Sequence, residues 1–152
     1  PEVLTRYQTR IAQEPDTLIS DQSQFQYHLR GGLFTVEVKS AVLRDLKKEP
    51  PLEQVLEDRF LTMETSRSSR NLITKQEEFT TREGEVTGLK VFGSGEFQVD
   101  DTEDFVKCRY AIIAFGGPGF YQWIHLTWRL DDPLSQRVAE RIMNSIEVSL
   151  EL

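Results

Sequence analysis

Residues 105–130 have the sequence FVKCRYAIIAFGGPGFYQWIHLTWRL, which predicts two strands joined by a turn at GGPG. This stretch contains both tryptophans of the chain. Residues 131–148 follow directly and predict a helix, with Asp132 as its N-cap and Pro133 in its first turn. Its apolar residues recur every four positions and form one face: Leu134, Val138, Ile142 and Ile146. We therefore expect an antiparallel hairpin followed by an amphipathic helix.

The second strand of this hairpin has two different faces, because side chains alternate along a strand. One face is apolar, which predicts core beneath a helix, and consists of Phe120, Ile124, Leu126, Trp128 and Leu130. The other is amphipathic and consists of Tyr121, Trp123, His125, Thr127 and Arg129. Tyr, Trp and Arg are enriched at binding hot spots, so this second face is the candidate binding surface. The alternative, that another helix covers it, stays open.

The rest of the chain predicts further strands and one more helix. Leu52, Val55, Leu56, Phe60 and Met63 form an apolar stripe at helical spacing, with Pro51 in the first turn. Strands are predicted over 24–29, 33–42, 72–81 and 86–99, whereas 3–19 is ambiguous. Residues 72–81 are polar enough for an edge strand or a solvent-facing strand, and the three glycines of 86–99 indicate bulging or close packing.

This order of elements predicts an α+β fold. Up to three strands precede the first helix, one of them in the ambiguous N-terminal part. Four strands and a second helix follow it. Short turns between neighbours indicate a largely antiparallel sheet of about six to seven strands, flanked by two main helices in an α/β/α sandwich. We expect residues 1–152 to form a single domain.

Composition narrows the classes of function. The net charge of −7 and the lack of clustered Lys and Arg argue against nucleic-acid binding. An acidic chain favours a basic partner, although solubility alone explains the charge. One cysteine, Cys108, rules out an internal disulfide, and no apolar run of about 18 residues predicts a transmembrane segment. The chain begins at Pro1, so a bacterial cell envelope, with a trimmed precursor, and the cytoplasm both stay open as its location.

Few residues have the pattern of a chemical site. His28 and His125 lie in different predicted strands and lack further ligands for zinc. Cys108 has no neighbouring histidine to activate it, and is better explained as a small core residue. The acidic residues Asp100, Asp101, Glu103 and Asp104 lack the glycine and final Glu of a calcium loop. The glycines at 93–95 and 116–119 fit turns better than a nucleophile elbow or a phosphate loop. We therefore expect no catalytic residue, metal or cofactor.

The order of these segments resembles the Mog/PsbP-like fold family, which includes PsbP of photosystem II, the yeast Ran-binding Mog protein and small bacterial proteins and lipoproteins. The resemblance is carried by the helix PLEQVLEDRFLTM at 51–63, by Val86-Thr87-Gly88 opening a strand, by the two long strands, and by Asn144-Ser145-Ile146 ending the last helix. It implies an antiparallel sheet with flanking helices, no enzyme activity, and a role as an assembly factor, chaperone or partner-binding module. It assigns no functional residue.

Three functions follow from these observations. The first is a non-catalytic accessory or binding domain that recognises a protein partner or an apolar segment through a sheet face or a sheet-edge groove. The second is a small-ligand-binding protein or enzyme whose pocket contains Tyr121, Trp123, His125 and Arg109. The third is a structural module of a larger protein or lipoprotein, with homodimerisation as its contact. A deep cavity in which His125 and Arg109 converge would favour the second function over the first.

Overall fold

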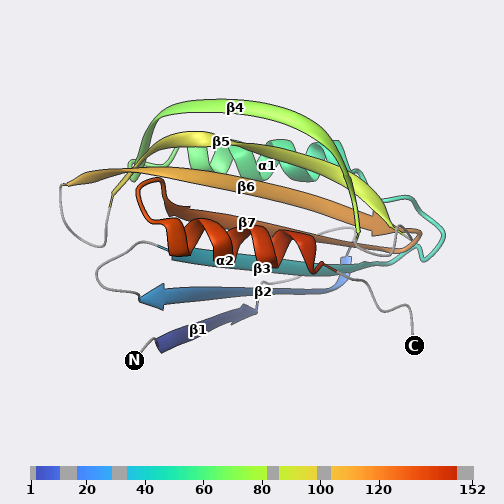
Figure 1. Ribbon diagram of the computed structural model, residues 1–152. Helices are drawn as coiled ribbons and strands as arrows, with labels where there is room; N and C mark the ends of the chain where they lie inside the picture. Colours follow the sequence, from blue (N-terminus) through green and yellow to red (C-terminus); the bar gives the residue numbers. More distant parts are fainter. Residues whose placement is uncertain (1–2, 11–16, 29–33, 82–85, 99–103, 147–152) are drawn as a thin grey trace.

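One seven-stranded sheet forms the centre of the fold, and all its described strand pairs are antiparallel (Figure 1). The computed structural model describes residues 3–10, 17–28, 34–81, 86–98 and 104–146. The elements in chain order are β1 (Val3–Arg10), β2 (Thr17–His28), β3 (Phe34–Leu43), α1 (Leu52–Glu64), β4 (Ser69–Thr80), β5 (Thr87–Gln98), β6 (Phe105–Gly117), β7 (Phe120–Arg129) and α2 (Pro133–Asn144). The spatial order is β1-β2-β3-β7-β6-β5-β4. The expected α+β architecture is confirmed.

The predicted hairpin is β6 and β7, and it lies in the middle of the sheet. Its turn requires glycine at position 119, where φ is +85° and an added Cβ would lie 2.7 Å from the carbonyl oxygen of Leu46. The Gly119 N–H donates to the carbonyl of Lys48, and the Gly119 carbonyl accepts from the N–H of Leu43. The turn is thereby tied to the segment between β3 and α1.

The two helices cover opposite faces of this sheet (Figure 1). Side chains pointing to α1 form the larger core, with Leu56, Met63, Phe97, Cys108, Tyr110, Ile112 and Trp123 among its buried members. Side chains pointing to α2 form a second core of Phe34, Ala111, Leu126, Trp128 and Ala139. The predicted stripe of α1 is confirmed, because Leu52, Val55 and Phe60 also pack on the first core.

The start of α2 confirms the predicted cap but corrects one core assignment. The Asp132 carboxylate accepts hydrogen bonds from the Leu134 N–H, at 3.1 Å, and from the Ser135 hydroxyl, at 2.8 Å. In this first turn Ser135 is the buried residue, and Leu134 is 44% exposed. Leu130 was also expected in the core but is 43% exposed, because β7 ends at Arg129 and the alternation ends with it.

Strand β2 is longer than predicted. It begins at Thr17 rather than at residue 24, because its polar part, near Asp21, is held by pairing to β1 and β3 on its two sides. The ambiguous first segment includes β1. The predicted turns at 30–32 and 82–85 and the acidic residues 100–103 lie outside the described residues.

Strand β4 is an edge of the sheet, as its polar sequence predicted. Its register with β5 shifts between Arg70 and Ile73, and Asn71 in this bulge has a φ of +56°. The carbonyl oxygen of Ile73 lies so close to β5 that an added Cβ at Gly93 would be 1.8 Å from it. Of the two alternatives expected for the glycines of β5, close packing is therefore confirmed, whereas the bulge lies in β4.

Candidate functional site

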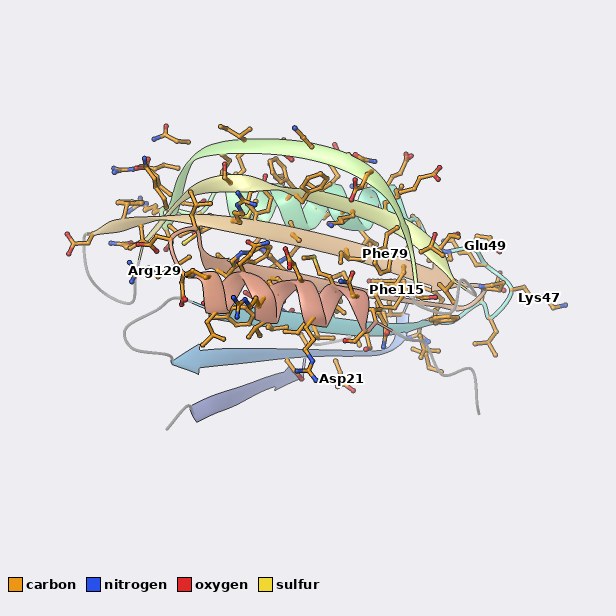
Figure 2. The ribbon with its side chains drawn as sticks, in the orientation of Figure 1. Asp21, Lys47, Glu49, Phe79, Phe115 and Arg129 are labelled. Carbon is orange, nitrogen blue, oxygen red and sulfur yellow. The ribbon has the colours of Figure 1, made fainter. Side chains whose placement is uncertain are left out.

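The amphipathic face of β7 lies beneath α1. Tyr121, Trp123, His125 and Thr127 are each only 5–6% exposed. Arg129, the fifth residue of the candidate binding surface, is partly exposed at the end of β7 and pairs with Asp131 at 3.0 Å (Figure 2). A helix thus covers this face, which is the alternative that the sequence left open. Whether these residues bind a partner stays a prediction.

A charged cluster lies between α1 and this face. Arg59 of α1 donates from Nη2 to the Glu37 carboxylate at 2.6 Å and from Nε to Nδ1 of His125 at 3.0 Å. Its guanidinium also stacks on the ring of Trp123, 4.6 Å from the centroid. Glu37 and His125 are direct partners in the register of β3 and β7. One arginine therefore joins a helix to two neighbouring strands.

The protonation of His125 follows from this geometry. Burial, and secondarily the charge of Arg59, lower the pKa of its imidazole to about 3, so the ring is neutral near pH 7. Because Nδ1 accepts from Arg59, the single ring proton resides on Nε2. Nε2 is buried and has no hydrogen-bond partner among the described residues. The cluster thus holds a neutral imidazole with one unused donor.

Arg59 separates two hollows along this helix. Tyr121 and Trp123 line one of about 310 Å³, together with Lys39 and Asp58. His125 and Thr127 line another, of about 250 Å³, on the other side of Arg59. We call the second the hydroxyl pocket, because its lining includes the hydroxyl side chains of Thr35, Thr62, Ser66, Ser68, Ser69 and Thr127. The five predicted residues are therefore not brought together in one pocket.

The structure does not bring Arg109 to these residues. Arg109 pairs with Trp128 in the register of β6 and β7, and Trp128 packs in the core beneath α2. Arg109 is therefore on the opposite face from His125 and is exposed. The cation beside His125 is Arg59 instead. For His28, the structure describes only the position of its backbone in β2.

Cys108 is a core residue on the α1 face. It is 0% exposed, and burial raises the pKa of its thiol to about 12, so the reactive thiolate is disfavoured. No group of three or more His, Cys, Asp or Glu side chains among the described residues is arranged to hold a metal ion.

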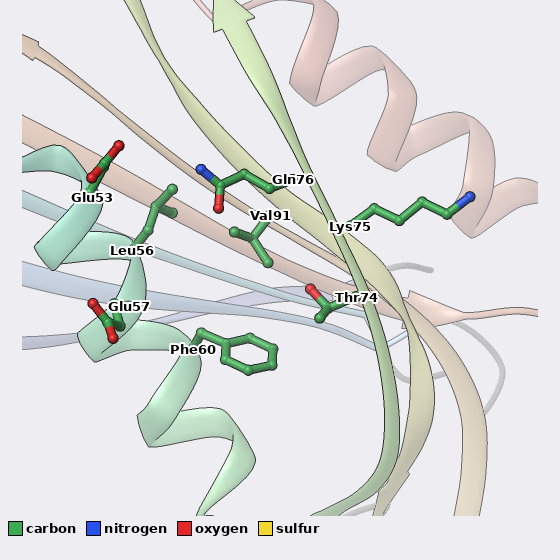
Figure 3. Close-up of a pocket in the computed structure, with 8 residues that line it drawn as sticks. All are labelled: Glu53, Leu56, Glu57, Phe60, Thr74, Lys75, Gln76 and Val91. Carbon is green, nitrogen blue, oxygen red and sulfur yellow. The ribbon is translucent and has the colours of Figure 1, made fainter.

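A hollow larger than these two lies at the β4 edge of the sheet, and we call it the edge groove. It has a volume of about 500 Å³ and is lined by Glu53, Leu56, Glu57 and Phe60 of α1, Thr74, Lys75 and Gln76 of β4, and Val91 of β5. Leu56, Phe60 and Val91 face one another across it, whereas Lys75 extends away from α1 (Figure 3). The groove thus has an apolar floor, carboxylates on the helix side and an edge strand on the other.

Sequence reasoning missed Arg59, although a signal for it was present. Arg59 is seven residues after Leu52, so it falls on the apolar stripe of the helix. A charged side chain at such a position must find a partner beneath the helix or leave a buried charge unpaired. Glu37 was placed on the polar face of its strand, but its partner 22 residues away could not be identified from spacing alone.

No helix among the described residues is long and apolar enough to cross a membrane.

Comparisons with known proteins give no family for this chain. No family model, curated protein or solved structure matches the sequence or the fold. The resemblance to Mog/PsbP-like proteins therefore stays a prediction.

Proposed function

We propose that this protein is a non-catalytic binding module that takes an extended, basic and apolar segment of a partner polypeptide into the edge groove. The observation that carries the proposal is the position of this groove, about 500 Å³ in volume, against the edge strand β4. In the described part of the chain β4 pairs only with β5. Its outer edge therefore offers backbone groups to which another extended chain can pair.

Strand addition would give such a segment a defined arrangement. Side chains of an added strand alternate between the two faces of the sheet, so every second one would point to the α1 side. There, Leu56 and Val91 are only 2% and 9% exposed, and Phe60 is partly buried beside them. Apolar side chains of the partner would extend this floor, and main-chain hydrogen bonds would supply affinity for many sequences.

The negative charge of α1 favours a partner segment of positive charge. The helix carries the carboxylates of Glu53, Glu57, Asp58 and Glu64, while its one cation, Arg59, is paired with Glu37. Glu53 and Glu57 lie in the groove lining. Lysine or arginine in the partner would complement them, whereas a second copy of this chain would bring like charges together. A basic peptide therefore fits this edge better than a homodimer.

The non-catalytic character is supported by the pKa values and the burial of Cys108 and His125, the two side chains considered as catalytic candidates. The Cys108 thiol has a pKa of about 12, and the His125 imidazole a pKa of about 3. Neither value suits a nucleophile or a general base near neutral pH. Both groups are also fully or almost fully buried.

The test is a titration with capped peptides of about eight residues, the length of a typical strand, that alternate valine with lysine or with glutamate. Amide chemical shifts of the protein report where each peptide binds. We expect the lysine peptide to perturb β4 and the Glu53–Phe60 part of α1 in a saturable way. The combined substitution Glu53→Lys and Glu57→Lys should weaken binding by about five- to tenfold, the size expected for exposed charge pairs.

A matched variant with the same change of net charge separates local from global electrostatics. Glu64→Lys with Glu140→Lys alters two exposed carboxylates outside the groove lining and should leave the affinity within about twofold. Equal binding of the glutamate peptide, or perturbations confined to surfaces away from β4, would rule out the proposal. Growth of the particle mass by light scattering without peptide would point to self-pairing of the edge instead.

A further inference from the structure

The unused donor of His125 marks a second site, separate from the edge groove. The imidazole lines the hydroxyl pocket and is 94% buried, since only 6% of its surface is exposed. Its Nε2 has no partner among the described residues, while Nδ1 is bonded to Arg59. A buried donor without a partner costs about 1–3 kcal/mol, so a bound acceptor oxygen would relieve a real penalty.

The floor of the hydroxyl pocket comes from two neighbouring pairs of β3 and β7. Glu37 is opposite His125, and Thr35 is opposite Thr127. These four side chains face α1, whose Arg59 closes one side of the pocket. Phe97 adds an aromatic ring from β5. The pocket lining thus combines hydroxyl groups, the N–H donor of His125, the amide of Gln98 and the apolar side chains of Phe97 and Met63.

The charges of the pocket favour a neutral ligand. Glu37 and Arg59 pair with each other at 2.6 Å, and their side chains are only 21% and 15% exposed. Because the two charges compensate each other, the pair gives the pocket no net charge with which to attract an ion. Hydroxyl side chains both donate and accept, so they match ligand hydroxyls, which do the same. The volume of about 250 Å³ corresponds to roughly eight water molecules, which suits a small compound.

We propose that the hydroxyl pocket binds a neutral polyhydroxy compound of monosaccharide size, one oxygen of which accepts a hydrogen bond from Nε2 of His125. Nε2 itself is covered, so the ligand reaches it by displacing side chains of the pocket wall. Thr62, Ser66 and Ser68 are exposed, so their rotation leaves the core in place and breaks only local hydrogen bonds, from the Thr62 hydroxyl to the Asp58 carbonyl and from the Ser68 N–H to the Ser66 hydroxyl. An apolar ring such as that of Phe97 would pack against the C–H face of a sugar.

The experiment is a titration of the whole protein with D-glucose, D-galactose, D-mannose and myo-inositol, with sodium acetate and methylammonium chloride as charged counterparts. Long-range proton–nitrogen NMR of the imidazole rings follows His125 directly. We expect a neutral His125 protonated at Nε2, and a saturable shift of this nitrogen with at least one of the neutral compounds. The substitutions Thr35→Val and Thr127→Val preserve side-chain shape, and each should weaken binding by about fivefold, the worth of one hydrogen bond.

Two controls keep the result specific. Thr87→Val, at an exposed position of β5 outside the pocket, should bind the same compound with unchanged affinity. Binding of the lysine–valine peptide should also persist in Thr127→Val, because the edge groove has a different lining. The proposal is overturned if no neutral compound shifts Nε2, if acetate binds more tightly than all of them, or if both threonine variants retain full affinity. Amide spectra of these variants verify that they are folded.

Discussion

The two faces of the sheet are both covered by a helix, but they are packed by different means. Beneath α2, Ala111, Leu126 and Ala139 are at most 1% exposed and form an apolar core. Beneath α1, equally buried residues such as Ile112 lie beside the charged cluster of Arg59, Glu37 and His125. The α2 face is thus stabilised mainly by burial of apolar surface, with one hydrogen bond from Trp128 Nε1 to Gln136 Oε1 at 2.8 Å, whereas the α1 face also depends on one ion pair.

This difference indicates that the α1 face, and not the α2 face, is packed less favourably than a purely apolar core. A buried ion pair contributes little to stability compared with an apolar replacement, and the unpaired Nε2 of His125 is unfavourable. Positions that break local rules of this kind are often functional sites. Both hollows beside Arg59 and the edge groove are lined in part by α1, so this face is the one on which we place the two proposed binding sites.

The largest effect is expected from removing apolar volume beneath α2. Leu126→Ala should lower the free energy of unfolding by about 2–5 kcal/mol, because the side chain is 0% exposed and leaves a cavity. Urea denaturation measures this change. Leu134→Ala, at a 44% exposed position of α2, is the control and should change stability by less than about 0.5 kcal/mol. Equal effects of the two would contradict the assignment of the α2 core.

A smaller effect is expected from breaking the ion pair beneath α1. Arg59→Leu leaves Glu37 partly buried without its cation and should lower the free energy of unfolding by about 1–3 kcal/mol. Adding Glu37→Leu removes the unpaired carboxylate and should restore at least half of the loss. Arg137→Leu, at an exposed position of α2, provides the control. If the double variant were less stable than Arg59→Leu alone, the pair would be more important than its burial indicates.

The smallest effect is the change in stability between pH 6.5 and 5, and we expect it from His125 on the α1 face. The folded pKa of His125, about 3, is below its unfolded value of about 6.5, so the unfolded state binds more protons in between. The contribution of His125 is complete above pH 6.5 and is lost as pH falls towards 3. Between pH 6.5 and 5 the slope should approach about 1.4 kcal/mol per pH unit.

Denaturation of His125→Gln over the same pH range isolates this contribution. The glutamine variant should lose the slope between pH 6.5 and 5, and His28→Gln should retain it. A His125 that titrates near pH 6.5 by NMR would show that the imidazole is accessible to protons in the folded state, contrary to its burial.

Much of the fold was predictable because it depends on local patterns. The alternation along 105–130 predicted both faces of β7, and the spacing of Leu52, Leu56 and Met63 predicted the buried stripe of α1. Leu134 was misplaced because the capping turn, and not the four-residue spacing, sets which residue of that turn is buried. The candidate site was only partly predictable. His125 was singled out, but its partner Arg59 is 66 residues away.

The sequence by itself determined the element types, their order and the two-sided character of the central hairpin, since these follow from short-range periodicity and turn residues. Only the tertiary structure decided that a groove lies between α1 and the β4 edge, that α1 covers the polar face of β7, and that Arg59 rather than Arg109 lies beside His125. These features depend on which strands become neighbours. Pairing between distant segments is set by the packing of the whole sheet, and no local pattern encodes it.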